Sequence, residues 1–208
     1  PALVYISQPT EYGTLYSLQE LEELSAVCRE RDLKLFVDGA RLAYALASPA
    51  NDVTLADLAR LTDVFYIGGT KCGSLFGEAV VIPERGSIRQ FVTQMKQHGA
   101  LLAKGRLLGV QFEALFEDGL YLTIGEPAVK ATARIREALK RAGYVVTMDS
   151  PTNLTFVALD QAGHERLSDK VRYSIWETLP DGRYLARIGT SWATPEEDVV
   201  AFAQALAR

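Results

Sequence analysis

Lys71 follows a short apolar run and a glycine-rich turn, a position that suits a nucleophile better than a solubilising surface charge. Residues 64–67 predict a buried strand, and Gly68-Gly69-Thr70 predicts a turn at its end. Such glycines let the backbone turn sharply or approach a ligand closely. A lysine amine attacks carbonyl groups when desolvation or a nearby cation lowers its pKa. Lys71 is therefore a candidate Schiff-base lysine, and the alternative is an ordinary loop lysine.

A second apolar run, residues 33–37, also predicts a buried strand, and it ends in Asp38-Gly39-Ala40-Arg41. Pyridoxal phosphate needs an amine for its aldehyde and a carboxylate for its pyridinium nitrogen, so Lys71 and Asp38 are the pair that it would use. Pairing with the pyridinium should lower the pKa of Asp38. The alternative for Asp38 is a turn residue in front of a glycine.

These two segments together resemble one enzyme family. They are similar to segments of the threonine aldolase / β-eliminating lyase family, whose members are fold-type I, pyridoxal phosphate (PLP)-dependent enzymes. The matching residues are Val37-Asp38-Gly39-Ala40-Arg41-Leu42 and Gly69-Thr70-Lys71-Cys72-Gly73. The resemblance covers nearly the whole chain but corresponds to the latter part of a typical family member. We therefore expect a fragment, whose missing part would hold the first strands, the phosphate-binding turn and the ring that stacks on the cofactor.

The resemblance implies a role for each of four residues. Lys71 would hold the cofactor aldehyde and then move protons as a catalytic group, and Asp38 would pair with the ring nitrogen. Arg41 would lie at the cofactor and reach the substrate carboxylate, a task that suits a guanidinium fork. Arg187 would be a second arginine on the same carboxylate. The alternatives are a helix-face arginine for Arg41 and a strand-edge arginine for Arg187.

Glu11 marks a departure from the family pattern. In the well-known threonine aldolases, the matching loop carries a histidine that acts on the substrate hydroxyl. Neither His98 nor His164 lies in that segment. A carboxylate can take a hydroxyl proton, so Glu11 is a candidate general base. It would equally fit a related branch of the family with a different reaction or substrate. Cys72, beside Lys71, is expected to be a packing residue.

The predicted elements place these groups at one edge of a sheet. Alternation of strand and helix over the first eighty residues predicts an open, mostly parallel α/β sheet, with active groups at the carboxyl ends of strands. Ser17-Leu18-Gln19-Glu20 is a capping box, so a helix begins at Ser17. The apolar residues at helical spacing predict its buried stripe: Leu18, Leu21, Leu24, Val27 and Cys28.

The second part of the chain predicts a small α+β unit. A helix is expected over residues 127–141 and another over 195–207. Strands are expected at 144–147, 154–159, 173–176 and 184–188. The fold class that we expect is an aspartate aminotransferase-type large domain over residues 1–122, incomplete at its N-terminal side, and a C-terminal small domain over residues 123–208.

Composition excludes several classes of protein. The 208 residues carry a formal net charge of -4, which gives no reason to expect nucleic acid or a membrane as partner. No apolar run is long enough to span a bilayer. Two scattered cysteines and two histidines favour a reduced, cytoplasmic setting without a metal site. Through the resemblance, we expect a homodimer or homotetramer, in which Lys104 or Arg106 would approach the neighbouring subunit's cofactor. The alternative is that both are exposed helix residues.

The function that we expect is a PLP-dependent aldehyde-lyase. It would cleave threonine or allo-threonine, both β-hydroxy-α-amino acids, to glycine and an aldehyde. One alternative keeps the cofactor and changes the reaction to β-elimination or transamination. Another is a cofactor-free fragment of such an enzyme.

Overall fold

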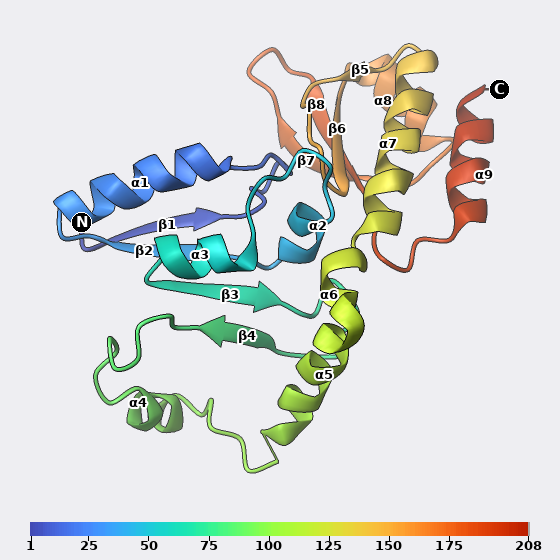
Figure 1. Cartoon of the computed structure of the whole chain (residues 1–208). Coiled ribbons are helices and arrows are strands. Elements are labelled where there is room, and N and C mark those ends of the chain that lie inside the picture. Colours follow the sequence, from blue (N-terminus) through green and yellow to red (C-terminus); the bar gives the residue numbers. More distant parts are fainter. Residues whose placement is uncertain (208) are drawn as a thin grey trace.

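Two four-stranded sheets form the framework of the protein in a computed structural model that describes residues 1–207 (Figure 1). The first sheet has the strand order β1-β2-β3-β4, and its first three strands are parallel while β4 runs antiparallel to β3. Its strands are β1 (Leu3–Ser7), β2 (Lys34–Asp38), β3 (Val64–Gly68) and β4 (Glu78–Val81). The mostly parallel sheet that the sequence predicts is confirmed.

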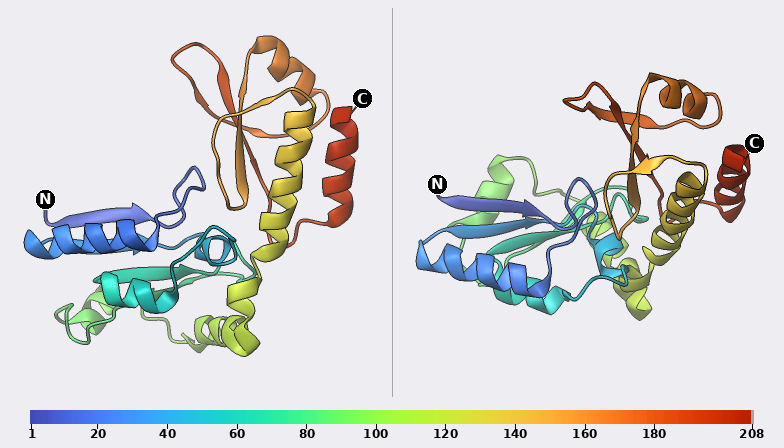
Figure 2. Two further views of the ribbon diagram at one scale, coloured as in Figure 1. Left: turned by 45° about the horizontal axis from the view of Figure 1, so that its top comes forward. Right: turned by 90° about the horizontal axis from the view of Figure 1, so that it is seen from above.

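Helices α1 (Leu18–Glu30) and α3 (Leu55–Leu61) lie on the same face of this sheet (Figures 1 and 2). The alternation of side chains along β2 explains why. Leu35 and Val37 are buried at 1% and 0% exposure, whereas Phe36 and Asp38, on the opposite face, are half-buried. The short helix α2 (Leu42–Leu46) follows directly after Asp38-Gly39-Ala40-Arg41.

The capping box at the start of α1 is present as predicted, with reciprocal bonds between Ser17 and Glu20. Cys28 is buried, also as predicted, but the prediction for Val27 is wrong because this side chain is 50% exposed. The buried stripe instead includes Ser25, whose hydroxyl donates to the carbonyl of Leu61 at 2.6 Å. Because its hydroxyl has a hydrogen-bond partner, Ser25 can be buried. The buried face of α1 therefore includes this polar residue, and Val27 lies outside it.

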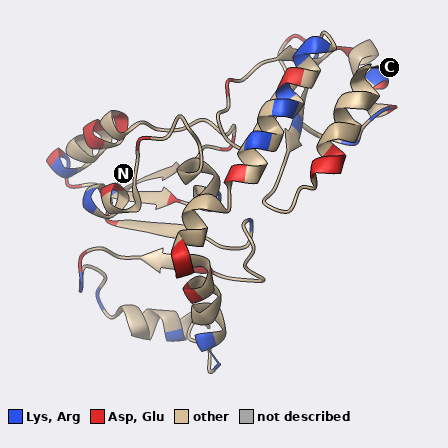
Figure 3. Ribbon diagram, turned by 45° about the vertical axis from the view of Figure 1, so that its right-hand side comes forward, with Lys and Arg blue, Asp and Glu red and all other residues tan. Residues whose placement is uncertain are grey.

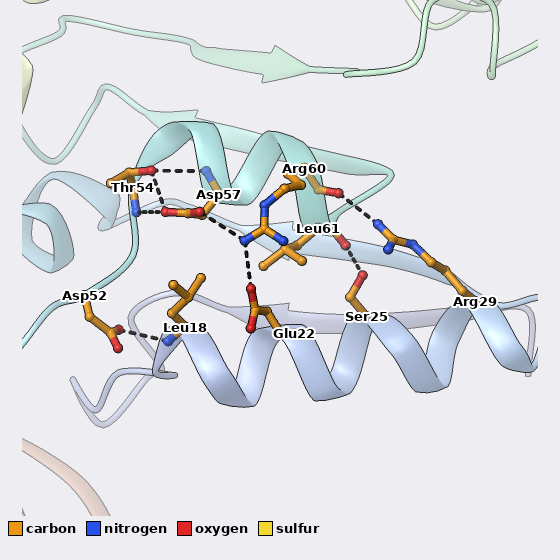
Figure 4. Close-up of polar contacts among 9 residues, drawn as sticks. All are labelled: Leu18, Glu22, Ser25, Arg29, Asp52, Thr54, Asp57, Arg60 and Leu61. Atoms are coloured by element: carbon orange, nitrogen blue, oxygen red, sulfur yellow. Dashed lines mark hydrogen bonds and ion pairs between the residues drawn. The ribbon is translucent and has the colours of Figure 1, made fainter.

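Polar contacts at the edge of this interface join α1 to α3 (Figure 4). Arg29 donates to the carbonyl of Arg60 at 2.8 Å, and Arg60 pairs with Glu22 at 2.9 Å. Asp52 accepts a hydrogen bond from the amide of Leu18, one of the free N–H groups at the helix start. The two helices are thereby fixed relative to each other on the sheet.

A helical segment connects the two sheets. Its elements are α4 (Phe91–Gln97), α5 (Arg106–Phe116), the 3₁₀ turn η1 (Glu117–Gly119), α6 (Leu120–Thr123) and α7 (Glu126–Arg141). Leu115 and Tyr121 belong to the core of the first sheet, and Ile135 and Leu139 of α7 belong to the core of the second. The basic residues of α7 are visible as blue bands in Figure 3, and all but the half-buried Arg136 are exposed.

The second sheet is antiparallel throughout, with the order β5-β6-β8-β7. Its strands are β5 (Val145–Val146), β6 (Leu154–Leu159), β7 (Ser174–Thr178) and β8 (Tyr184–Gly189). One face packs on α7 and α9 (Glu196–Ala207), as Figure 2 shows. The sequence did not predict α8 (Gln161–Ser168), a short polar helix capped by Asp160.

All six residues of β6 are buried. Val157 and Leu159 point into the core with α7, whereas Leu154 and Phe156 point the other way and pack with Tyr12. The loop between β1 and α1 therefore covers part of the second sheet. Within residues 1–207, no helix is both long and apolar enough to cross a membrane.

Candidate active site

Asp38 ends β2 and receives hydrogen bonds from several directions. The Tyr5 hydroxyl of β1 donates to Oδ2, and the Ala40 amide donates to Oδ1 at 2.9 Å. Burial by itself would raise the pKa of Asp38, but the Tyr5 and Tyr66 hydroxyls, the amide and the charge of Lys71 outweigh it and lower that pKa. The carboxylate is therefore ionised at neutral pH.

The turn that carries Lys71 is held by Glu78 of β4. The amide of Gly69 donates to Oε2 of Glu78 at 2.6 Å, and the Thr70 hydroxyl donates to Oε1 at 3.0 Å. From the other side, the hydroxyl of the buried Tyr121 donates to the carbonyl of Gly68 at 2.9 Å. The turn is thus a fixed structure, and Lys71 leaves it from a defined position.

Lys71 is itself anchored through its main chain. The hydroxyl of Tyr44 in α2 donates to the carbonyl oxygen of Lys71 and accepts a bond from the Trp192 amide at 3.4 Å. Tyr44 is only 1% exposed. The helix that follows Asp38 therefore also fixes the backbone of Lys71.

Two glycines let β2 and β3 come together at the site. The Gly68 amide donates to the Gly39 carbonyl at 2.9 Å. A Cβ atom on Gly39 would lie 1.9 Å from the carbonyl oxygen of Tyr66, and one on Gly68 would lie 2.4 Å from that of Ala40. Any side chain at either position would push apart the two strand ends that carry Asp38 and Lys71.

The charges around Lys71 act on its amine from several elements. Desolvation lowers the pKa of Lys71, and the neighbouring charge of Arg41 lowers it further, whereas Asp38, Glu11 and Glu78 partly oppose the shift. The net direction is downward, which favours the free amine that acts as a nucleophile. Four of the five residues predicted for the site therefore share one electrostatic environment.

Arg41 and Glu11 form an ion pair at 2.9 Å. The Arg41 side chain is 17% exposed and that of Glu11 is 50% exposed, so the pair lies at the surface of the site, with the arginine on the inner side. The structure thus brings Glu11 to the carboxyl ends of β1 and β2.

Arg187, the fifth predicted residue, lies in β8 of the second sheet and is half-buried. Its guanidinium carbon lies 4.4 Å from the centroid of the Trp176 ring, a cation–π contact. Among residues 1–207, no hydrogen bond or ion pair joins it directly to the other four. Cys72 is a packing residue, because it is 2% exposed and burial raises the pKa of its thiol to about 11.

Residues 1–162 match the beta-eliminating lyase family. The chain belongs to that family. This match confirms the family resemblance that the sequence indicated. The expected fold class is confirmed by the similar solved structures.

Similar proteins include several threonine aldolases. A low specificity L-threonine aldolase from Pseudomonas sp. (strain NCIMB 10558) is 39% identical over 204 residues, which are 96% of this chain and 57% of that protein. One from Pseudomonas aeruginosa is 31% identical over the same shares. The solved structure of Leishmania major threonine aldolase is 46% identical in sequence, with a TM-score of 0.94. The match covers 100% of this chain and 61% of that one.

The chain thus spans about half the length of the curated relatives that it matches. A Thermus thermophilus aspartate aminotransferase is only 17% identical at a TM-score of 0.70, which shows a shared fold.

Three tyrosines around the site could not be identified from the sequence. Tyr5 and Tyr66 look like ordinary strand residues, and Tyr44 looks like part of an apolar helix. Strand alternation gives a partial signal, since Tyr5 shares a face with Ser7, whose register partner is Asp38. Nothing in the sequence places the Tyr44 hydroxyl at the carbonyl of Lys71.

The residues present fit the cofactor that the beta-eliminating lyase resemblance implies. Asp38 is ionised, and a carboxylate with its four lone-pair sites can accept another hydrogen bond beside those from Tyr5 and Ala40. Lys71 has a lowered pKa. An ionised carboxylate and a readily deprotonated amine are the two groups that the ring nitrogen and the aldehyde of PLP need.

Proposed function

We propose that the protein is a PLP-dependent aldehyde-lyase that cleaves threonine or allo-threonine to glycine and an aldehyde. The observation that carries the proposal is that Asp38 and Lys71 lie at the ends of adjacent strands, each influencing the charge of the other, with the pKa of each lowered by its surroundings. The similarity to threonine aldolases over nearly the whole chain supports the choice of reaction.

Each of the two central residues has a distinct task. When bound, PLP supplies an electron sink that stabilises negative charge at the substrate Cα. Asp38 keeps the ring nitrogen protonated, and the Tyr5 hydroxyl orients the carboxylate for that task. Lys71 holds the cofactor aldehyde, and its amine, once free, moves protons at the substrate.

Arg41 and Arg187 bind the substrate carboxylate in this proposal. Arg41 already holds a carboxylate, that of Glu11, at 2.9 Å, so its guanidinium is oriented for an anion within the site. The guanidinium of Arg187 packs on the Trp176 ring, a contact that leaves its positive charge available to bind an anionic ligand. Two positive groups would fix the amino acid by its carboxylate.

Glu11 serves as the base that takes the proton of the substrate hydroxyl. Its support is position, because Glu11 is half-exposed and paired with Arg41. A carboxylate beside the arginine that binds the substrate is close to the substrate's other polar groups. Replacing Glu11 by Gln keeps the shape and the hydrogen-bonding capacity while removing the base. Unchanged retro-aldol turnover in Glu11→Gln would remove this role.

We also propose a homodimer or homotetramer. Many large apolar side chains of α4–α6 and the turn after Lys71 are exposed, among them Leu75, Phe76, Val92, Leu102, Leu107 and Val110. Apolar patches of this kind mark interaction surfaces. The segment also contains Lys104 and Arg106, which would approach the neighbouring subunit. Sedimentation analysis of the purified protein tests the assembly state.

The division of the chain near Leu122 is part of the same proposal. Tyr121 packs in the core of the first sheet and Ala131 in that of the second, which supports units over residues 1–122 and 123–208. A cytoplasmic location is supported by two free, buried cysteines.

The experiment that tests the function follows the products from L-threonine and L-allo-threonine with added PLP. The proposal expects glycine and acetaldehyde in equal amounts. Release of ammonia with a keto acid would instead favour β-elimination. Lys71→Ala, which keeps the turn but removes the amine, is the matched inactive variant.

A further inference from the structure

The loop of residues 8–14 joins the two arginines assigned to the substrate carboxylate. We propose that Tyr12 in this loop is a positioning residue, which holds Trp176 and through it orients Arg187 toward the amino-acid carboxylate. The inference rests on the proposed function for the identity of its ligand. Neither Tyr12 nor Trp176 is among the residues that the sequence predicts for the site.

The tip of the loop is fixed on the segment that leads into β6. The carbonyl of Gly13 accepts hydrogen bonds from the Ser150 hydroxyl at 3.1 Å and from the Thr152 hydroxyl at 2.9 Å. Both hydroxyl residues are buried, at 0% and 1% exposure. A Cβ atom on Gly13 would lie 2.2 Å from the Ser150 oxygen, and its φ of +77° also requires glycine. The loop is therefore seated closely on the second sheet.

Tyr12 extends this contact across two strands. Its ring centroid lies 5.3 Å from that of Phe156 in β6 and 6.1 Å from that of Trp176 in β7, the latter edge-on. Its hydroxyl donates to Glu177 at 3.1 Å. Aromatic pairs at such separations are favourable beyond their buried area. The ring of Tyr12 thus packs against the same indole that Arg187 contacts.

A bulge in β7 turns Trp176 toward these partners. The register between β7 and β8 shifts between Ile175 and Glu177, so Trp176 is the extra residue of the bulged strand. Bulges re-aim side chains and are common next to active sites. The indole ring lies 4.4 Å from the guanidinium carbon of Arg187. An aromatic ring orients a guanidinium without neutralising its charge, which leaves Arg187 able to bind an anion.

The same loop reaches the other arginine through the preceding residue. Glu11 pairs with Arg41 at 2.9 Å, while Tyr12 contacts Trp176. Two adjacent loop residues therefore set the positions of Arg41 and Arg187 relative to each other. Binding one carboxylate with two arginines requires that separation to be fixed before the ligand arrives.

Kinetics of Tyr12→Leu test the inference, with Tyr12→Phe as the conservative variant. Loss of the ring should raise KM for threonine about tenfold and change kcat by less than about twofold, because orientation of the carboxylate contact is lost. Tyr12→Phe keeps the ring and should restore KM. Tyr184→Leu, in the same strand as Arg187 but packed on His164, should leave both constants unchanged. If Tyr12→Leu does not fold, Trp176→Leu should give the same rise in KM.

A binding measurement separates positioning from catalysis. In a Trp192→Phe background, Trp176 is the remaining one of the two tryptophans. Adding glycine should change its emission, and adding ethanolamine, which keeps the amine but lacks the carboxylate, should not. The glycine response should disappear in Tyr12→Leu and persist in Tyr12→Phe.

The outcomes distinguish this inference from the proposed function. A wild-type protein that responds to glycine but does not cleave threonine would contradict the function and leave the role of Tyr12 standing. A protein that cleaves threonine, with the same KM and the same glycine response in Tyr12→Leu as in wild type, would overturn the role of Tyr12.

Discussion

The hydroxyl of Tyr44 donates a hydrogen bond to the main-chain carbonyl of Lys71, and thereby ties the candidate nucleophile to the helix that follows Asp38. The same hydroxyl accepts a bond from the amide of Trp192, which lies just beyond β8 of the second sheet. One buried tyrosine therefore joins the strand end that carries Asp38, the turn that carries Lys71 and the unit that carries Arg187.

Tyr44→Phe should lower the free energy of unfolding by about 1–3 kcal/mol, because the Lys71 carbonyl and the Trp192 amide lose a partner in a buried place. Chemical denaturation measures this change. Tyr16→Phe is the matched control, since the Tyr16 hydroxyl makes no hydrogen bond within residues 1–207, and its effect should stay within about 0.5 kcal/mol. Equal effects of the two substitutions would argue against an anchoring role for Tyr44.

The pKa of Lys71 should respond to neighbouring charges with opposite signs. Arg41 lowers this pKa, so Arg41→Gln should raise it and move the pH dependence of Lys71 labelling by an aldehyde reagent to higher pH. Glu11 raises this pKa, so Glu11→Gln should move the same profile to lower pH. Peptide mapping after labelling at a series of pH values isolates Lys71. Shifts of the same sign in both variants would contradict the electrostatic picture.

Gly39→Ala should destabilise the protein by about 3 kcal/mol or prevent folding, because its Cβ would lie 1.9 Å from the Tyr66 carbonyl oxygen. Gly109→Ala is the matched control in α5, where a Cβ meets nothing within 4 Å. That helical substitution should stabilise by about 0.5–1 kcal/mol. Thermal melts compare the two variants, and a mild effect at Gly39 would mean that the strand ends can separate.

Much of the fold could be predicted, because strand and helix periods in this chain are clear. The strand ends at Asp38 and before Lys71 follow from apolar runs that stop in glycine turns. The exposure of Val27 could not be predicted, because the rotation of α1 about its axis depends on the hydrogen bond from the Ser25 hydroxyl to the Leu61 carbonyl. That partner lies far away in the sequence, and only the packed structure brings it close.

The candidate site, like the fold, could be predicted from the sequence only in part. Residues with distinctive chemistry, such as Lys71 and Asp38, can be found from type and spacing. Tyr5 and Tyr12 could not be found, because a tyrosine in a strand or loop is commonplace and its role depends on which neighbour its hydroxyl or ring meets. Those neighbours, Asp38 and Trp176, are set by sheet register and by the docking of one sheet on the other.

Tyr5→Phe should lower the free energy of unfolding at neutral pH but not in acid. Asp38 has a folded-state pKa below its ordinary value of 3.8, partly through the Tyr5 hydroxyl, so the ionised carboxylate stabilises the fold. That contribution is present above pH about 4 and is lost as the pH falls through the lowered pKa. The difference in unfolding free energy between wild type and Tyr5→Phe should therefore shrink in that range. A difference independent of pH would contradict this role of Asp38.

The role of Lys71 as the residue that holds the cofactor is tested most directly by borohydride reduction of the PLP-treated protein followed by peptide mass mapping. The reagent fixes the cofactor on whichever lysine holds its aldehyde. We expect a pyridoxyl group on Lys71, less of it in Asp38→Asn, and none at this position in Lys71→Ala. A pyridoxyl group on another lysine, with Lys71 unmodified, would contradict that role.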